Sequence, residues 1–513
     1  MRVIGLLALA FLASPLIAAP RLDVRDFGAV GDGKADDTAA IQRCFDALPV
    51  TGGPIVLSPG TYRCTTTLKL TGKSNVTLTG QGALLDFVSA PAKPAMEHCL
   101  LVTGTEKQPI ENPRLEGLRV RTVQGYGLSI AYFRSATIRD CTVHQSGLSG
   151  LYCSFGTGCL ITGNHVIRGG DNGIYTFSVN DLSITGNIVE KSHGTGGIAT
   201  MIGDGIVISG NTVRDSDIAG IGTWDLCRNV LITGNIVAGA NNIGIEIEWN
   251  GDWDSRTRDV TVAGNVVTGA AQRGIQVYHG SCGDVVIRDN EIGRCRTGVI
   301  LIDCEGVEIT GNRISRSGQD GIWVSDEGNT TCSRILIERN RILNCNLQSI
   351  WNAFCGVRIG PRHREVRVSD NTIANEEQEL KVWYEGPADA ASFTYDCAIL
   401  TLKEAGKSVK ELHIADMPTE RADKLAAAIS AVPGWHAELI GPRFGLCPLF
   451  ERSGNVPGND RVVEVPCKGR AAGGALHAKR LLSGIMSAGD PATTVLEGNR
   501  ISGVSGEPIA RTP

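Results

Sequence analysis

The sequence predicts an all-β solenoid in which short parallel strands stack coil upon coil, and three observations lead to this fold class. Many of the 64 glycines recur at regular intervals along the 513 residues. Short segments such as LSITGNIV, IVISGNTV and VLITGNIV repeat every 23 or 24 residues at first and at longer steps later. Between them lie short runs of Ile and Val bounded by Gly or Asn, and no stretch there is long or amphipathic enough for a helix.

The first 19 residues predict an export signal rather than part of the fold. MRVIGLLALAFLASPLIAAP has an early Arg, an apolar run and then small residues, so the mature chain is expected to begin near Pro20 or Arg21. No later segment approaches the roughly 20 apolar residues of a membrane helix. We therefore expect a periplasmic or extracellular protein that does not insert into a membrane.

The residues after the signal carry a resemblance to a known family. VRDFGAVGDGKADDTAAIQRCFDAL, GGPIVLSPGTYRC and SNVTLTGQGALLD resemble the opening of the pectate-lyase-like and polygalacturonase-like right-handed β-helix superfamily. The resemblance implies a right-handed parallel β-helix over residues 20–375, with a short helix that caps its first coil. Asp36 or Asp37 suits the N-cap of that helix.

After Asn371 the repeat is interrupted, and residues 376–513 predict a small α/β segment. TTVLEGNRISGV near the end restores the Gly-Asn pattern. Two arrangements stay open: a cap at the end of the stack, or an insertion after which a late strand returns to it.

Two residue types recur at fixed places in the repeat and have structural explanations. The repeated asparagines, from Asn164 to Asn371, are expected to form a ladder of amide hydrogen bonds inside the coil. Among the sixteen cysteines, Cys227, Cys282, Cys304 and Cys332 share one place in their coils, which allows either disulfides or buried thiols. We expect them to be structural rather than metal ligands.

Alternation along the strands predicts which side chains face outward. In segments such as GIEIE the isoleucines share one face and should enter the coil, so the residues between them point out. The outward positions of three consecutive coils then form one patch, with the small residues Ala199 and Gly222 leaving a groove below it and residues 250–258 forming a wall. The patch holds Trp224, Asp225, Glu246, Glu248, Trp249, Gln276, Tyr278 and His279.

Carboxylates beside aromatic rings suit sugar chemistry, and the first hypothesis is a glycoside hydrolase acting on a polysaccharide or oligosaccharide. Its acid/base set is Glu246, Glu248 and Asp225. The two glutamates should lie roughly 6 to 7 Å apart, nearer the spacing of inverting than of retaining enzymes. The expected substrate-binding residues are Phe177, Trp224, Trp249, Arg273, Gln276, Tyr278 and His279, with His193 and Asp204 as further candidate contacts.

Two other functions stay open. A polysaccharide lyase or epimerase acting on a uronate polymer would use Tyr278, His279 and Arg273, with calcium held by Asp225, Asp252 and Asp254. A noncatalytic glycan-binding β-helix is the third hypothesis. A hydrolase would need no cofactor. The net charge of −5, with both signs mixed, argues against nucleic acid as a partner.

Overall fold

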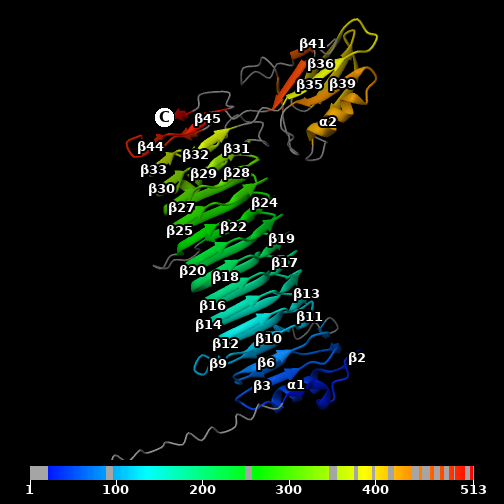
Figure 1. The fold of residues 1–513 in the computed structure, drawn as a ribbon, viewed down its shortest axis with the longest axis vertical. Helices are drawn as coiled ribbons and strands as arrows, with labels where there is room; N and C mark the ends of the chain where they lie inside the picture. The colour runs from blue at the N-terminus through cyan, green and yellow to red at the C-terminus, as the bar shows by residue number, and fades with distance from the viewer. Residues whose placement is uncertain are drawn as a thin grey trace, which may run out of the picture.

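The computed structural model describes residues 21–87, 96–248, 257–345, 355–374, 379–395, 399–413, 421–440, 450–452, 463–466, 474–478, 485–489, 491–502 and 509–511. Most of them form a tall stack of parallel strands that starts at α1 (Thr38–Ala47) and rises through the chain, with an α/β unit beside its far end (Figure 1). The predicted all-β parallel solenoid is confirmed. The predicted export signal lies outside the described residues.

Seven coils in the middle of the stack each contribute one long strand, which spans two sides, and one short strand. In the coil of β20 (Ala219–Thr233), the first half pairs with β22 (Ile243–Glu248) and the second half with β23 (Arg258–Ala263). The short strand β21 (Ile236–Ala238) pairs with β24 (Val266–Thr268). Each coil therefore has three sides, called here the first, second and third face in chain order.

The first and second faces belong to one parallel sheet of 23 strands. Besides β20, β22 and β23, its strands are β1 (Leu22–Asp23), β3 (Gly53–Val56), β5 (Leu68–Thr71), β6 (Val76–Thr79), β8 (His98–Thr103), β9 (Ile110–Glu111), β10 (Arg114–Glu116), β12 (Tyr126–Arg139), β14 (Leu151–Thr162), β16 (Asn172–Thr185), β18 (Gly196–Ser209), β25 (Arg273–Arg288), β27 (Thr297–Thr310), β29 (Ile322–Ser325), β30 (Ser333–Glu338), β32 (Val357–Ile359), β33 (Arg364–Ser369), β43 (Ile485–Ser487), β44 (Thr494–Glu497) and β46 (Ile509–Arg511).

The third face is a parallel sheet of 15 strands. Besides β21 and β24, it comprises β2 (Asp32–Asp36), β4 (Gly60–Arg63), β7 (Ala83–Asp86), β11 (Arg119–Arg121), β13 (Thr142–His144), β15 (His165–Ile167), β17 (Ile188–Glu190), β19 (Thr212–Arg214), β26 (Glu291–Gly293), β28 (Arg313–Ser315), β31 (Arg341–Leu343), β34 (Thr372–Ala374) and β45 (Arg500–Ser502). Two short 3-10 helices, Val24–Phe27 and Glu327–Asn329, lie between strands.

The N-terminal cap forms as its sequence predicts. Asp37 is the N-cap residue of α1, and its carboxylate accepts hydrogen bonds from the backbone N–H groups of Val30 and Gly31. Asp36 accepts from the backbone N–H of Thr38, which meets the need of an unpaired donor in the first turn. Ile41 and Phe45 on the inner side of α1 are buried in the main core and close the first coil.

The repeated asparagines form the expected ladder at the corner between the second and third faces. The Oδ1 of Asn235 accepts from the backbone N–H and the Nδ2 of Asn211, while its own Nδ2 donates to the Oδ1 of Asn265. The same bonds run from Asn164 to Asn371 and on to Asn499. Because buried amides must find partners, the ladder ties each coil to the next.

Between β34 and β43 the chain leaves the stack and forms a unit with a core of its own. The strands β43, β44 and β45 then pair in parallel with β32, β33 and β34. This pairing is the second of the two arrangements left open by the sequence, an insertion followed by a return. The unit comprises α2 (Arg421–Ser430), β35 (Glu379–Tyr384), β36 (Ala391–Tyr395), β37 (Ile399–Glu404), β38 (Lys407–His413), β39 (Trp435–Ile440), β40 (Phe450–Arg452), β41 (Val463–Pro466) and β42 (Gly474–Ala478).

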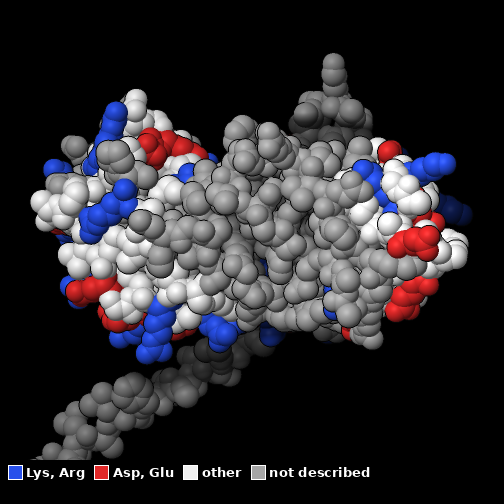
Figure 2. Space-filling model, turned by 90° about the horizontal axis from the view of Figure 1, so that it is seen from above, with Lys and Arg blue, Asp and Glu red and all other residues white. Residues whose placement is uncertain are grey.

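The cysteines in the described part of the chain are buried thiols without disulfides. Cys282 and Cys304 are partners in the register of β25 and β27, and the sulfur of Cys304 lies 3.7 Å from that of Cys332. Within the described ranges, no helix is long and apolar enough to cross a membrane. Seen from above, both basic and acidic side chains are visible at each side of the molecule, as the mixed composition predicts (Figure 2).

Candidate active site

The strand β22 places two glutamates on the first face. Its Ile245 and Ile247 are fully buried inside the coil, so that the residues between and after them turn outward. The parallel register aligns Gly222, Glu246 and Gln276 in one column, and Trp224, Glu248 and Tyr278 in the next. Both columns agree with the prediction from alternation.

The indole of Trp224 folds back over its own strand. A Cβ atom added at Gly222 would lie 2.6 Å from the Cζ2 of Trp224, so the ring occupies the space that the glycine leaves. The indole Nε1–H donates to the Oε2 of Glu246 at 3.2 Å. The groove expected over Ala199 and Gly222 is therefore absent at these residues, because Ala199 is fully buried and the ring fills the place above Gly222.

Glu246 is only 5% exposed, and a chain of polar contacts holds its carboxylate. Gln276 donates from Nε2 to the Oε1 of Glu246 at 2.9 Å. Arg273 donates to the amide oxygen of Gln276 and, at 2.9 Å, to the carboxylate of Glu327. Gln276 is itself 2% exposed, so the prediction that it contacts substrate is corrected: both ends of its amide hold neighbouring side chains.

The side chains of Glu246 and Glu248 are hydrogen-bonded to each other. Burial raises the pKa of Glu246, while hydrogen bonds from Trp224 and Gln276 and the charge of Arg273 act in the opposite direction. Burial, the charges of Glu246 and Asp225, and the hydrogen bond to Glu246 raise the pKa of Glu248 to about 7. Because this bond lowers the pKa of Glu246 and raises that of Glu248, Glu248 is its donor. Because the two carboxyl groups are in hydrogen-bond contact, the expected separation of roughly 6 to 7 Å between them is wrong. That distance holds for Cα atoms two residues apart along a strand.

Asp225 lies at the bend that follows Trp224, with a φ of 39°. Phe155, Ser178 and Ile202 take the equivalent place in the preceding coils with φ values of 53°, 55° and 58°, so this backbone conformation belongs to the bend of the coil. Its negative charge acts on Glu248 from the neighbouring coil. The structure thus brings the three predicted acid/base residues into one electrostatic unit.

An aromatic row leads up to this unit along the same face. Phe177 aligns with Met201, and Met201 with Trp224, so that Phe177 lies two coils before the tryptophan. Its ring meets Phe155 edge to face at 5.4 Å, and Phe155 stacks on Tyr132 at 4.9 Å. Phe155, 43% exposed, and Tyr132 were missed by the sequence reasoning, although their place at the bend of the coil could have signalled them.

The remaining predicted residues divide into two groups. Trp249, Asp252 and Asp254 lie outside the described residues, as does the side chain of His279. The other two are engaged elsewhere: His193 contacts Asp217 at 3.1 Å, and Asp204 accepts from Asn229 at 2.6 Å.

Calcium binding stays a prediction. Two of the three aspartates proposed as its ligands, Asp252 and Asp254, are outside the described residues. Among the residues that are described, no group of three or more His, Cys, Asp or Glu side chains is arranged to hold a metal ion.

Comparisons with known proteins agree with this architecture. Residues 126–283 and 254–392, together more than half of the chain, match the family described as the right handed β-helix region. This protein belongs to that right-handed β-helix family. Residues 22–104 also match the family described as rhamnogalacturonase A/epimerase, pectate lyase-like.

Among curated proteins, the chain is similar to mannuronan C5-epimerases AlgE5 and AlgE2 of Azotobacter vinelandii. It is 29% identical to AlgE5 over 224 residues and 28% identical to AlgE2 over 218 residues, or 35% and 34% of this chain. The matches cover 22% of each relative, so the chain spans about a fifth of their length.

Among solved structures, the pre-mature gene product 12 of bacteriophage phi29 superposes with a TM-score of 0.57 at 18% identity. The match covers 69% of this chain and 52% of that protein. At this identity the likeness shows the fold alone.

Proposed function

We propose that this protein is a carbohydrate-active enzyme that removes the C5 proton from a uronate residue of a polysaccharide, as an epimerase or a lyase does. The observation that carries the proposal is the contact between Glu248 and the nearly buried Glu246, beside the charge of Asp225, which together with burial raises the pKa of Glu248 to about 7. The similarity to mannuronan C5-epimerases supports a uronate substrate. Action on a polysaccharide outside the cell agrees with the export signal predicted in residues 1–19.

A protonated Glu248 supplies what this reaction needs first. The C5–H of a uronate becomes acidic only when the negative charge of its carboxylate is neutralised, and a neutral carboxylic acid can donate a hydrogen bond to that carboxylate. The negative charge of the patch would repel a uronate, and the proton on Glu248 reduces that charge. In the free protein Glu246, held by Trp224 and Gln276, accepts the hydrogen bond from Glu248. When a uronate binds, its carboxylate takes the place of Glu246 as the acceptor of that one proton.

The proton transfer itself is assigned to Tyr278, which lies beside Glu248 in the next coil. The C5–H bond breaks, the proton goes to the phenolate oxygen of Tyr278, and the electron pair moves into the carboxylate group. A proton from water added to the opposite face of C5 gives the epimer, and Tyr278 then returns its proton to water. If the C4–O bond breaks instead, the proton on Tyr278 passes to the leaving oxygen and the products are an unsaturated uronate and a shorter chain.

A glycoside hydrolase is the second candidate, and the position of Asp225 favours it. Direct contact between Glu246 and Glu248 is too close for either spacing used by glycosidases, about 5 to 5.5 Å or about 6.5 to 9.5 Å. Asp225 follows Trp224, the register partner of Glu248 in the preceding coil, and its charge acts on Glu248 without a direct carboxyl–carboxyl hydrogen bond among the causes of the pKa shift. In that reaction Glu248 would be the general acid and Asp225 the nucleophile.

Deuterium exchange separates these reactions. The protein is incubated in D2O with mannuronan and with other uronate polymers, and the products are read by NMR, ultraviolet absorbance and reducing-end assay. Deuterium at C5 without cleavage means epimerisation, and deuterium with absorbing unsaturated ends means elimination. New reducing ends without deuterium mean hydrolysis and contradict the proposal. Binding without any product supports the noncatalytic glycan-binding reading.

Two substitutions at Glu248 test its role. The amide of Glu248→Gln can still donate a hydrogen bond to a carboxylate, so C5 exchange should stay within about tenfold of the wild type, whereas Glu248→Leu should lose about 10² to 10⁴-fold. If Glu248 protonated a glycosidic oxygen instead, the glutamine variant would lose as much as the leucine variant. Glu308→Gln, an exposed glutamate on β27, is the matched control.

A further inference from the structure

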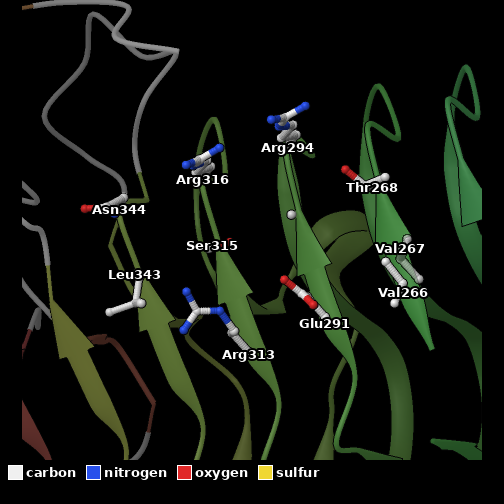
Figure 3. Close-up of a pocket in the computed structure, with 11 residues that line it drawn as sticks. Val266, Val267, Thr268, Glu291, Arg294, Arg313, Ser315, Arg316, Leu343 and Asn344 are labelled. Carbon is white, nitrogen blue, oxygen red and sulfur yellow. The ribbon is translucent and has the colours of Figure 1, made fainter. Parts of the chain in front are cut away.

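A hollow of about 340 Å³ lies on the third face, across β24, β26, β28 and β31 (Figure 3). None of its lining residues belongs to the candidate active site, which lies on the first face. It is lined by Val266, Val267, Thr268, Glu291, Gly293, Arg294, Arg313, Ser315, Arg316, Leu343 and Asn344.

The hollow forms where one outward side chain is missing. In the register of the third face, Gly293 stands between Thr268 and Ser315. The neighbouring residues Ile292 and Ile314 are fully buried and point into the core of the coil. A Cβ atom at Gly293 would lie 3.1 Å from the carbonyl oxygen of Ser315, so a larger residue would narrow the space.

Arginines dominate the charge around this hollow. Arg294 and Arg316 lie just beyond the ends of β26 and β28, and Arg313 begins β28 beside Glu291 of the preceding coil (Figure 3). Arg341 continues the row as the register partner of Arg313. Glu291 is the one carboxylate among the lining residues, against three guanidinium groups.

Arginines on the outside of the stack fall into two groups. Some meet an acid of the neighbouring coil, as in Arg139–Glu116 at 2.8 Å and Arg334–Glu305 at 3.0 Å. Arg294, Arg313 and Arg341 belong to the other group, since no ion pair joins them to another residue of the described ranges.

Arg294 and Arg316 follow equivalent strands of successive coils. Two cations about 4.8 Å apart along the stack repel each other, and an anion bound between them would relieve that repulsion.

We propose that this hollow binds an acidic oligosaccharide. Guanidinium groups pair with carboxylates through two parallel hydrogen bonds, and a row that repeats with the coils suits a chain that repeats its carboxylates. Thr268 and Ser315 offer hydroxyl groups to sugar hydroxyls, while the exposed side chain of Val266 offers an apolar surface to a sugar ring. The inference does not depend on the reaction proposed above, because the two sites lie on different faces.

The test measures binding of a mannuronate oligomer to the full chain by calorimetry, beside a neutral mannan oligomer of the same length. Arg294→Gln combined with Arg313→Gln should weaken binding of the acidic oligomer at least about tenfold, because two charge-assisted contacts are lost. Arg288→Gln combined with Arg339→Gln, two arginines paired with neighbouring acids, is the matched control and should leave binding unchanged. Added salt should weaken the wild-type interaction.

Hydrogen exchange locates the contact. Bound acidic oligomer should protect residues 291–316 in the wild type and not in the arginine variant. Three results would each overturn the inference. The arginine variant could bind the acidic oligomer with unchanged affinity, or the wild type could bind the neutral oligomer equally well. Inorganic phosphate, added at the same concentration of negative charge as the oligomer, could displace it. If the wild-type protein bound the acidic oligomer at the arginines but catalysed no C5 exchange, only the proposed reaction would be overturned. If it catalysed C5 exchange but did not bind the oligomer at the arginines, only this site would be overturned.

Discussion

The indole of Trp224 donates a hydrogen bond of 3.2 Å to Glu246, one coil further along, while its ring covers Gly222 on its own strand. The glycine and the tryptophan thus act together: the missing side chain creates the space, and the ring uses it to shield and hold a carboxylate. The neighbouring Glu248 owes part of its raised pKa to that ionised partner.

Gly222→Ala should disturb this arrangement without unfolding the protein. The added methyl group would lie 2.6 Å from the ring carbon Cζ2 and would push the indole away from Glu246. Losing a hydrogen bond to a charged group costs about 1.5 to 3 kcal/mol, so we expect activity to fall about tenfold to a hundredfold. Activity and tryptophan fluorescence are measured together. An unchanged emission spectrum with full activity would contradict the role given to Trp224.

The pKa of Glu248 predicts how stability depends on pH. At low pH both the folded and the unfolded chain hold the proton, whereas between the ordinary value of 4.5 and about 7 only the folded chain does. Stability from this group is therefore present below about pH 4.5 and is lost as the pH rises through about 7. Glu248→Gln removes this titration. The melting temperature of the variant, compared with that of the wild type at the same pH, should therefore increase as the pH rises. A difference that stays constant from pH 4 to 8 would show that the pKa is not raised.

The asparagine ladder should be strongest at its middle. Asn235→Ala leaves the buried N–H groups of Asn211 without their acceptor and removes the bond to Asn265. Each unsatisfied donor costs about 1 to 3 kcal/mol, so the free energy of unfolding should fall by about 3 kcal/mol or more in urea titrations. Asn499→Ala, at the less buried end of the ladder, should cost less. Equal losses would mean that burial does not set the strength of these bonds.

The thiols on the solenoid should resist alkylation until the protein unfolds. Cys227 and Cys282 are fully buried, and burial raises the pKa of each to about 12. Both the lack of access and the lack of thiolate suppress reaction. Peptide mapping after brief treatment with iodoacetamide should find these two cysteines unlabelled in native protein and labelled in urea. Labelling at the same rate in both conditions would contradict the buried ladder.

Much of the solenoid could be predicted because its determinants are local and repeated. Alternation put Ile245 and Ile247 inside, and the constant step put Glu246 beside Gln276 and Glu248 beside Tyr278. The return of the chain after residue 478 could be foreseen only as one of two arrangements, because a single late Gly-Asn segment does not say which strand it joins. Asn499 decides it by accepting from Asn371.

The sequence by itself determined which residues face outward and which coils they share, since both follow from a period of two along each strand and a repeated coil length. Only the tertiary structure decided what those side chains do. The rotation of Trp224 over Gly222, the contact between Glu246 and Glu248, and the burial of Gln276 depend on side-chain torsions and on contacts across coils. Those contacts are set by packing in three dimensions, and no spacing along the chain encodes them.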